Sequence, residues 1–382
     1  MSDPQAVLTT TGPASGAGPT EPAPTRRARR VPTGALPVLG LVVVLLIAPI
    51  YVDGAWLRTG LLAIAAAVAA LGLSLLLGQA GQLSLGHSFF VAVGAYGYTC
   101  LAAEGDGPVG LGLPPAVALV LAVLLAGVAG LAFSPIAGRL RGIYLGVASL
   151  GLVFGGLHVL GNAEPLTGGA HGRNVPSFEL FGFTFDRVPG ETFGVLGVPF
   201  GKEEKLWYLA VAILAVAYVY YRNLVRARPG RALRAVRDRE LMAGITGVPV
   251  ARYKAYAFVV SSMYAGLGGV LLALAFGRIV PESFGFLLSV DFLVMIVIGG
   301  AGSVGGAALG AVFVTALPLV LNHYSGSLPL LAEPGSGGVG ASEFSRFVYG
   351  AAIVAVLLFA RDGLAGLARR ARRSPEVKER VA

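Results

Sequence analysis

Long apolar runs separated by short polar segments follow one another along this chain from about residue 36 onward. Most are about 15 to 22 residues long, the length at which an α-helix crosses a hydrocarbon core of about 30 Å. They predict spans at about 36–52, 59–77, 88–103, 114–134, 143–161, 205–221, 255–276, 286–300, 304–322 and 345–360. The runs at 88–103 and 286–300 are so short that a re-entrant or broken helix is an alternative there. The pattern predicts an all-α polytopic membrane protein with about ten transmembrane helices, and at least about eight.

The composition agrees with a membrane protein and excludes an ordinary soluble enzyme. Of the 382 residues, 55% are hydrophobic and 13% are charged, against roughly 25% charged in soluble domains. The net charge is +9, but most arginines lie between the apolar runs, so we expect contact with a lipid bilayer and not with nucleic acid. The single cysteine, Cys100, lies inside an apolar run and predicts packing, with no disulfide and no metal site.

The charges of the loops predict the orientation of the chain in the membrane. Residues 222–254 hold nine basic and two acidic residues, a net charge of +7, whereas 163–205 hold four basic and six acidic residues. Because basic loops stay in the cytoplasm, 222–254 is expected inside and 163–205 outside. The segment 361–382 has a net charge of +4 and is also expected inside. Both termini are then cytoplasmic. This requires an even number of spans, and ten spans meet the requirement.

This orientation divides the chain into three parts. Residues 1–35 lack apolar periodicity and predict a disordered cytoplasmic tail that ends in arginines. Residues 36–362 form the predicted transmembrane domain, with 163–205 as an extracytoplasmic loop and 222–254 as a cytoplasmic loop. Residues 363–382 are a basic cytoplasmic tail.

Ionisable residues are scarce within the predicted spans. Asp291, near the outer end of a span, His158 and His87 are the candidates, and we assign Asp291 an interfacial position in preference to a proton relay. No catalytic or metal motif is present. The stretch from Gly300 to Gly305 matches the dinucleotide pattern G-x-G-x-x-G, but no acidic residue follows about twenty positions later. It predicts a tight hairpin between helices, with Gly306 and Gly310 as a packing face.

A second glycine-rich cluster, from Gly78 to His87, holds uncharged polar residues suited to a solute path. Its Ala-Gly-x-Leu pattern at 80–83 returns as Ala-Gly-x-Val at 301–304. Transporters place broken helices at equivalent points of two halves, so the pattern indicates an internal repeat of two halves with Gly-rich broken helices. Two unrelated glycine hairpins are the alternative. The candidate path residues are Gln79, Gln82, Ser84 and His87. Hydrogen bonding across helices is the alternative for them.

The cytoplasmic loop carries a basic segment with helical character. Pro229 opens a helix, and Gly247 with Pro249 closes it, which predicts one continuous helix over 231–246. That helix is about 24 Å long at 1.5 Å per residue. Arg234 and Asp238 fall four residues apart as an ion pair. Small residues share one face, namely Ala232, Ala235, Val236, Ala243 and Thr246. Such a ridge fits a groove on another protein, while a basic helix resting on anionic lipid, disfavoured by the lack of Trp, Phe and Leu on that face, is the alternative.

This segment resembles the cytoplasmic signature of the LivM-type permeases of branched-chain amino acid ABC transporters. The matching residues are Arg234, Ala235, Val236, Arg237, Asp238, Glu240, Ala243 and Gly247. Further segments match in the family's order across about 36–362, namely Gly78–Gly86 with Gly94–Tyr96, Leu140–Leu145, Leu166–Ala170 and Ile298–Ser303. The resemblance implies a contact that couples the chain to an ATPase. Its residues are Arg231, Arg234, Ala235, Arg237, Asp238, Glu240, Ala243 and Gly247. The resemblance also implies that the outer-loop motif receives a binding protein or gates the outer mouth, through Thr167, Gly168, Gly169 and His171.

Some residues depart from the family pattern. Arg239 and Pro249 stand where the family usually has asparagine, as does His171, and Ser149 replaces a frequent threonine. Met242 and Gly244 lie where Ala and Glu are usual. These differences leave the coupling role intact but put the solute in question, because the family includes permeases that resemble those for urea and short amides.

The resemblance implies a permease subunit of an ABC importer in the bacterial inner membrane. Its expected partners are a LivH-type permease, two cytoplasmic ATPase subunits that bind ATP and magnesium, and an extracytoplasmic solute-binding protein. The expected solutes are branched-chain amino acids, or related amino acids and amides such as urea. This chain would hold no cofactor and would not be an enzyme. An ion-coupled secondary transporter is the main alternative, and a membrane enzyme or scaffold is the other.

Overall fold

The computed structural model describes residues 44–104, 109–180, 182–186, 194–195, 198–199, 201–323, 341–359, 363 and 366. The predicted N-terminal tail, residues 36–43 of the predicted span at 36–52 and nearly all of the predicted C-terminal tail lie outside these residues. Apart from Val44, the described residues belong to one compact unit, Leu45–Ala382.

The unit is built almost entirely of helices. The long ones are α2 (Gly54–Ala80), α3 (His87–Ala102), α4 (Pro115–Arg139), α5 (Ile143–Asn162), α7 (Lys202–Arg226), α10 (Val250–Phe276), α11 (Phe286–Gly299), α12 (Val304–His323) and α13 (Ala341–Phe359). The short ones are α6 (Glu164–Thr167), α8 (Arg228–Asp238) and α9 (Glu240–Ile245), with 3₁₀ turns η1 (Gly169–His171) and η2 (Pro281–Phe284). The strands are two-residue antiparallel pairs: β1 (Arg173–Asn174) with β6 (Arg278–Ile279), β2 (Glu179–Leu180) with β3 (Phe183–Thr184), and β4 (Gly194–Val195) with β5 (Val198–Pro199).

Seven helical segments of the described chain are long and apolar enough to cross a membrane. They are 54–80, 115–139, 143–162, 202–226, 250–276, 281–299 and 304–321. The prediction of an all-α polytopic membrane protein is therefore confirmed. Helices α3, with 16 residues, and α11, with 14, are only about 24 Å and 21 Å long at 1.5 Å per residue. Both were predicted as short segments, and neither alone reaches across a core of about 30 Å.

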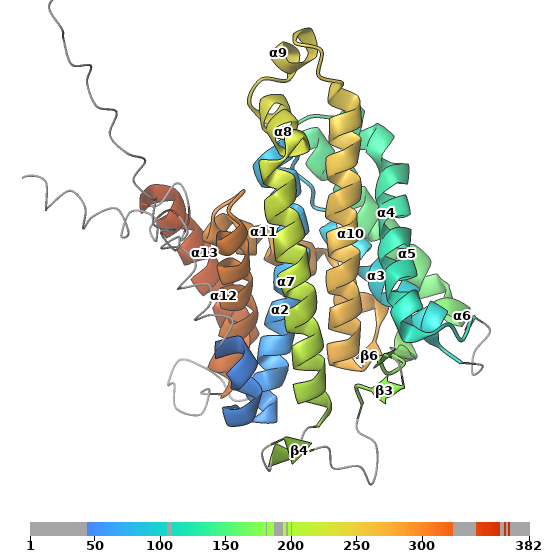
Figure 1. Ribbon diagram of the computed structural model, residues 1–382. Coiled ribbons are helices and arrows are strands. Elements are labelled where there is room, and N and C mark those ends of the chain that lie inside the picture. Colours follow the sequence, from blue (N-terminus) through green and yellow to red (C-terminus); the bar gives the residue numbers. More distant parts are fainter. Residues whose placement is uncertain are drawn as a thin grey trace, which may run out of the picture. The chain divides into compact units, whose positions relative to one another are not determined.

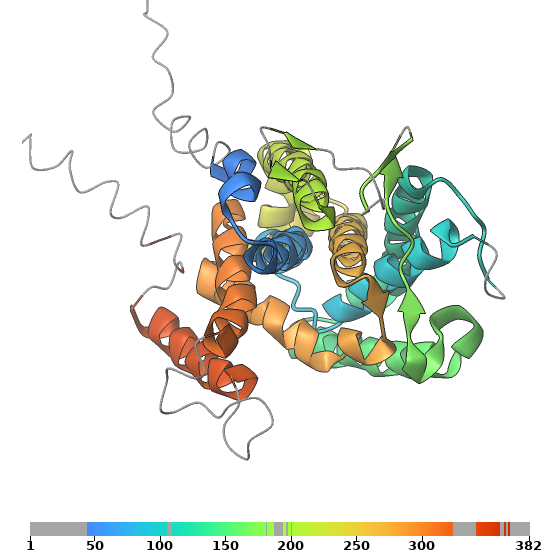
Figure 2. The ribbon, with the colours of Figure 1, turned by 90° about the horizontal axis from the view of Figure 1, so that it is seen from below.

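Helices α2 and α10 form the core of the unit. Each has 27 residues, and they lie side by side with α3, α4, α7 and α12 around them (Figures 1 and 2). Small residues allow this close approach: a Cβ on Gly268 would lie 2.7 Å from the Ala69 Cβ. By contrast, α4 and α5 expose apolar side chains on one face, Val120, Val128 and Val147 among them, as a lipid-facing surface does.

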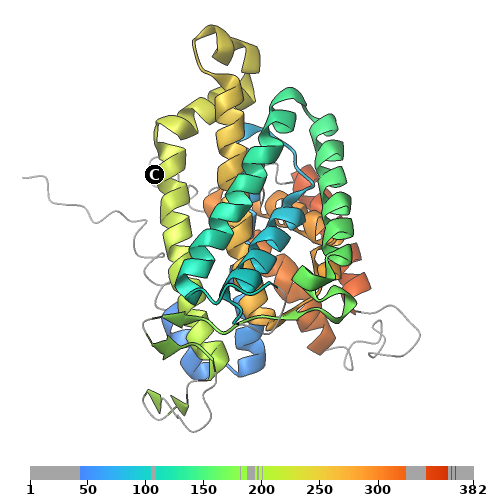
Figure 3. The ribbon, with the colours of Figure 1, turned by 90° about the vertical axis from the view of Figure 1, so that its right-hand side faces the viewer.

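The two ends of the helical unit differ. Helices α8 and α9 lie at one end, where α7 finishes and α10 begins (Figures 1 and 3). The short strands and the motif at 167–171 lie at the opposite end, where β1 pairs with β6 next to the C-terminal end of α10. The segments predicted as cytoplasmic and extracytoplasmic are thus separated by the length of the long helices.

The prediction of one continuous helix over 231–246 is wrong. The helix stops at Asp238, Arg239 is extended with φ −151° and ψ 89°, and a second helix starts at Glu240. Asp238 pairs with its neighbour Arg237 at 2.9 Å and not with Arg234 as predicted. The break lets Glu240 reach basic side chains on other elements, a tertiary contact that overrides the local periodicity.

The glycine stretch at 300–305 is a helix hairpin, as predicted. Helix α11 ends at Gly299 and α12 begins at Val304. Gly300 and Gly302 have φ of +105° and +81°, a region that side chains avoid and glycine tolerates. Gly306 and Gly310 pack directly against the α11 backbone at Gly299 and Met295, which confirms the predicted packing face.

Candidate functional site

Helix α8 lies on the C-terminal end of α2. Leu233 and Val236 are buried. The next residue, Arg237, donates a hydrogen bond of 2.5 Å from its Nη1 to the Gly78 carbonyl. The last carbonyls of a helix lack intrahelical partners and carry the negative end of its dipole. Arg237 therefore satisfies an open carbonyl of α2 with a positive charge. Gly81 leaves room for it, since a Cβ there would lie 2.7 Å from the Arg237 Cγ.

The α11–α12 hairpin meets the same end of α2. Gln79 donates a hydrogen bond of 3.2 Å from its Nε2 to the Gly302 carbonyl. Gly78 packs so closely on the backbone of Gly302 that any Cβ at Gly78 would overlap it. The two glycine clusters singled out in the sequence are thus in direct contact, with Arg237 beside them. We call this contact of α2, α8 and the hairpin the joint.

Helix α9 is tied to the bundle through a single carboxylate. Glu240 forms salt bridges of 2.7 Å with Lys254 on α10 and 3.3 Å with Arg141 in the α4–α5 loop. The Lys254 side chain is only 6% exposed, so this pair is far better shielded than an ordinary surface pair. Glu240 therefore holds the start of α9 against two transmembrane elements.

The rest of α9 presents apolar side chains to the outside. Leu241 is 74% exposed, Met242 54% and Ile245 79%. Ala243 alone among the described α9 residues is buried. We call Leu241, Met242 and Ile245 the apolar tip. The apolar tip was not predicted from the sequence, because one continuous helix over 231–246 places the small residues, and not these three, on the face that docks.

The other predicted coupling residues divide between the two sides of this segment. Arg231, Ala235, Asp238 and Gly247 are exposed, and Arg234 is half-buried. Arg237, Glu240 and Ala243 instead contact the bundle or pack in the α9 turn. The exposed residues lie on α8 and just after α9, on either side of the apolar tip in sequence, and Arg237 and Glu240 connect the segment to α2 and α10.

The predicted path residues lie in the interior near the joint. Gln82 donates to the Ala137 carbonyl at 3.3 Å, the Ser84 hydroxyl accepts from the Gly86 N–H at 3.2 Å, and the His87 Nε2 lies 2.8 Å from the Ala69 carbonyl oxygen. Gln79 and Gln82 each leave a buried Oε1 without a partner among the described residues. Hydrogen bonding across helices accounts for the other contacts, and a solute path through these residues stays a prediction.

The outer-loop motif is a tightly folded connector. The buried Thr167 donates from its hydroxyl to the Leu160 carbonyl at 2.8 Å and accepts from the Gly169 N–H at 3.1 Å. Gly168 and Gly169 have φ of +74° and +55°. The exposed His171 accepts hydrogen bonds at its carbonyl from Arg278, next to the β1–β6 pair. Thr167 and the glycines thus fix the turn after α5, and His171 remains at the surface.

The comparisons with known proteins decide the family. A family described as branched-chain amino acid transport system / permease component matches residues 57–357. The chain belongs to this family. It is 30% identical over 311 residues to the high-affinity branched-chain amino acid transport system permease protein LivM of Salmonella typhimurium, covering 78% of this chain and 67% of that protein. LivM of Escherichia coli K12 matches with the same identity and coverage. LivH of Escherichia coli K12 is 26% identical over 307 residues, 78% of this chain and 91% of that protein. No solved structure matches significantly.

The predicted identity as a LivM-type permease is confirmed. The chain is a permease subunit of an ABC importer and a multi-pass protein of the inner membrane. A transport permease is not an enzyme, and the roles of the residues above in coupling and in solute passage stay predictions.

Proposed function

We propose that this chain forms one half of the channel of a branched-chain amino acid importer, beside a LivH-type permease. Two cytoplasmic ATPase subunits bind and hydrolyse ATP, and an extracytoplasmic solute-binding protein delivers the solute. The observation that carries this proposal is the exposed apolar tip of α9, fixed to the bundle by Glu240 and by the joint at Gly78. Binding of labelled leucine, isoleucine, valine and urea to the cognate solute-binding protein tests the solute class.

The apolar tip supports docking on an ATPase. Three neighbouring apolar side chains on a six-residue helix in water lose contact with water only when a partner covers them. The alternative of a helix lying on lipid gains anchors from the same residues. We favour docking because the basic face around Arg231 and Arg234, with Asp238 beside it, adds charges of both signs suited to a protein partner.

The contacts of α8 and α9 supply a route for coupling. A movement of the tip displaces Glu240, and with it Lys254 on α10 and Arg141 between α4 and α5. The same movement displaces Arg237 and the end of α2, to which the α11–α12 hairpin is bound. A movement of α8 and α9 is thus transmitted to α2, α4, α5, α10 and the α11–α12 hairpin. Alternating access of a central cavity needs such a combined movement of several spans.

The ends of the helical unit bear on the proposed topology. Ten spans, both termini in the cytoplasm, 163–205 outside and 222–254 inside are consistent with the opposite ends at which α8–α9 and β1–β6 lie. A two-half repeat is supported by the element pattern: α2 and α10 each have 27 residues and end at a left-handed glycine, Gly81 or Gly277, before the short helix α3 or α11. This alignment of α2 with α10 differs from the one predicted from the sequence, in which 80–83 at the end of α2 matches 301–304 after α11. Since α2 and α10 run in opposite directions, this repeat is inverted.

Cysteine labelling tests the orientation. In a Cys100→Ser background, an impermeant maleimide should label Asn174→Cys on the exposed β1 strand from outside intact cells, and Thr246→Cys beside the tip only from the cytoplasmic side. The positive charge of 222–254 is the reason. Labelling of both cysteines from the same side contradicts the topology.

The outer-loop turn is expected to be sensitive to a side chain at Gly169. In Gly169→Val, the residue is forced into φ +55°, and its Cβ would lie 3.1 Å from the Glu164 Cγ, where a β-branched residue is strained. We expect uptake to fall about tenfold at equal membrane abundance, a loss of about 1.4 kcal/mol. Ala170→Val changes the exposed neighbour and is the matched control. Equal uptake by both variants shows that the turn is only a linker.

A further inference from the structure

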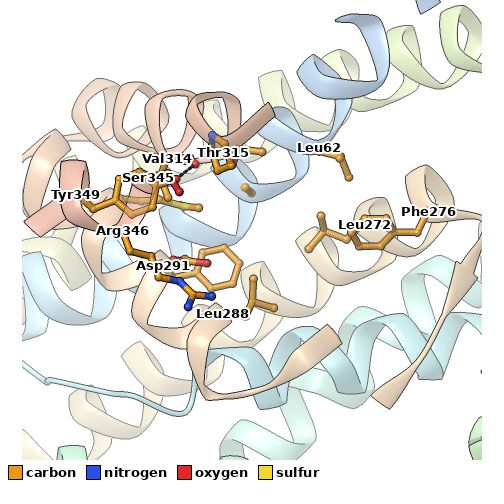
Figure 4. A pocket seen from close by; sticks show the side chains of 14 residues that line it. Leu62, Leu272, Phe276, Leu288, Asp291, Val314, Thr315, Ser345, Arg346 and Tyr349 are labelled. Carbon is orange, nitrogen blue, oxygen red and sulfur yellow. Dashed lines mark hydrogen bonds between the residues drawn. The ribbon is translucent and has the colours of Figure 1, made fainter. Parts of the chain in front are cut away.

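A cavity of about 240 Å³ lies between α2, α10, α11, α12 and α13 (Figure 4). Its wall is mostly apolar, with Leu62, Leu272, Leu288, Phe292 and Met295 among the lining residues. The lining comes from the N-terminal halves of α2 and α13, the C-terminal parts of α10 and α12, and α11 from Leu288 to Met295. These parts of the helices lie away from α8 and α9, so the cavity occupies the half of the unit on the proposed outer side.

Two opposite charges line this mostly apolar cavity, together with the uncharged polar residues Thr315, Ser345 and Tyr349. Asp291 comes from α11, where it is half-buried, and the exposed Arg346 comes from the second turn of α13. Figure 4 shows the carboxylate and the guanidinium near one another at one side of the cavity. They are close enough to interact electrostatically. Within the described part of the chain, however, neither takes part in an ion pair of 4.0 Å or less. Charges at membrane depth are costly and persist mainly where they serve a function.

The position of Arg346 is fixed by the packing of α13 on α12. Pro318 has no N–H, so the Val314 carbonyl, four residues earlier, loses its helical partner. The buried Tyr349 hydroxyl donates to that carbonyl at 2.5 Å. Tyr349 lies three residues after Arg346 on the same helix and also lines the cavity. The bond therefore holds the face of α13 that carries the guanidinium against the cavity.

The size of the cavity suits a small amino acid. Its volume of about 240 Å³ equals that of about eight water molecules at about 30 Å³ each. Valine, leucine and isoleucine have about eight or nine non-hydrogen atoms, close to this number of water molecules, and therefore fit in the cavity. Each is a zwitterion with an ammonium and a carboxylate on one carbon, followed by a branched aliphatic group. A neutral solute such as urea has neither charge and no aliphatic group.

We propose that this cavity binds the transported amino acid as a zwitterion, with its α-ammonium on Asp291, its α-carboxylate on Arg346 and its aliphatic side chain against the apolar wall. The inference rests on the proposed function and adds the residues that recognise the solute and the groups of the solute that they bind. A zwitterion fits between the two charges and satisfies both, whereas a solute with only one charge leaves the other group unpaired in an apolar cavity. The site is distinct from the polar cluster at Gln79 and Gln82.

Photo-crosslinking locates the site. We expect photo-leucine, a diazirine analogue of leucine, to label peptides containing 286–299 or 341–359 in the wild-type importer, assembled with all partner subunits in proteoliposomes and loaded through its binding protein. Excess leucine should remove the label. In Asp291→Asn and Arg346→Gln, we expect labelling of these peptides to fall at least tenfold. Glu282→Gln, just before α11, and Arg58→Gln, at the exposed start of α2, remove like charges outside the cavity lining and should keep the wild-type yield.

Free analogues, tested on the importer without its binding protein, identify the groups that are recognised. Leucine should compete for photo-leucine labelling about tenfold better than 4-methylpentanoate, which lacks the ammonium, or leucine amide, which lacks the carboxylate. In the labelling that remains in the variants, Asp291→Asn should lose the preference over 4-methylpentanoate, and Arg346→Gln the preference over leucine amide. Equal competition by the three compounds in the wild type overturns the zwitterion site.

Two measurements keep this test separate from the proposed function. Wild-type uptake of leucine driven by ATP tests the importer itself. If that uptake occurs but the label maps to peptides outside α11 and α13, the cavity proposal is wrong and the importer assignment stands. If uptake is absent, the importer assignment fails and the proposal fails with it. Basal ATP hydrolysis in the variants reports that they fold and assemble, and the position of the wild-type label does not depend on any variant.

Discussion

Replacement of Leu241 and Ile245 by aspartate is expected to abolish association of the chain with its ATPase subunits. The two side chains are 74% and 79% exposed, so the folded permease loses little when they are changed. In the complex, the same change buries unpaired carboxylates where apolar groups were covered. Loss of a central interface residue costs about 2 kcal/mol or more, so we expect at least about a thirtyfold weaker complex.

The measurement is co-purification of the ATPase subunits, followed by solute-stimulated ATP hydrolysis. Ala251→Asp is the matched control, because it adds the same charge to an exposed position at the same end of the bundle, on α10. Ala235→Arg, on the outward face of α8, is expected to weaken association to a smaller extent, since Ala235 borders the tip and is not part of it. Full recovery of the ATPase subunits by the Leu241→Asp, Ile245→Asp double variant refutes docking at α9.

The second large effect is expected at the joint, where Arg237→Ala should uncouple ATP hydrolysis from transport. The variant loses the 2.5 Å bond to the Gly78 carbonyl and leaves that carbonyl at the end of α2 without its cationic partner. The apolar tip is untouched, so the ATPase subunits should stay bound. We expect uptake to fall at least about tenfold, the effect of about 1.4 kcal/mol, with ATP hydrolysis retained.

Arg228→Ala is the control for Arg237→Ala. It removes the same charge from the exposed first residue of α8, and Arg228 has no hydrogen bond or ion pair with any residue that the structure describes. Its uptake should stay within about twofold of the wild type, as is usual for a surface charge. Equal losses in the two variants mean that Arg237 acts through its charge alone and not through α2.

The apolar periodicity was sufficient to predict the class of the fold and the approximate position of most spans. It identified 88–103 and 286–300 as short segments, and these are α3 and α11. The glycine pattern predicted the hairpin at Gly300–Ser303, because the positive φ that such a turn needs is a local property of the backbone. The outer-loop turn at Thr167–Gly169 is local in the same sense.

The tertiary contacts of the site could not be predicted in this way. The break at Arg239 serves salt bridges from Glu240 to Arg141 and Lys254, which are 99 and 14 residues away in sequence. The 3.6-residue period contains no information on such pairs, so 231–246 was predicted as one helix. Arg346 was not singled out either. Its significance comes from Asp291 on another helix and from the bond of Tyr349, on its own helix, to the Val314 carbonyl that Pro318 leaves without a helical partner.

The central proposal is that ATP hydrolysis by partner subunits drives transport through this chain. The direct test is uptake of labelled leucine into proteoliposomes that contain this chain, a LivH-type permease and the two ATPase subunits, with the solute-binding protein outside. We predict uptake that requires ATP on the cytoplasmic side, stops when the ATPase subunits are omitted, and is unchanged when proton and sodium gradients are collapsed. Uptake by the permease subunits alone, driven by a proton or sodium gradient without ATP, would contradict the account and identify an ion-coupled carrier.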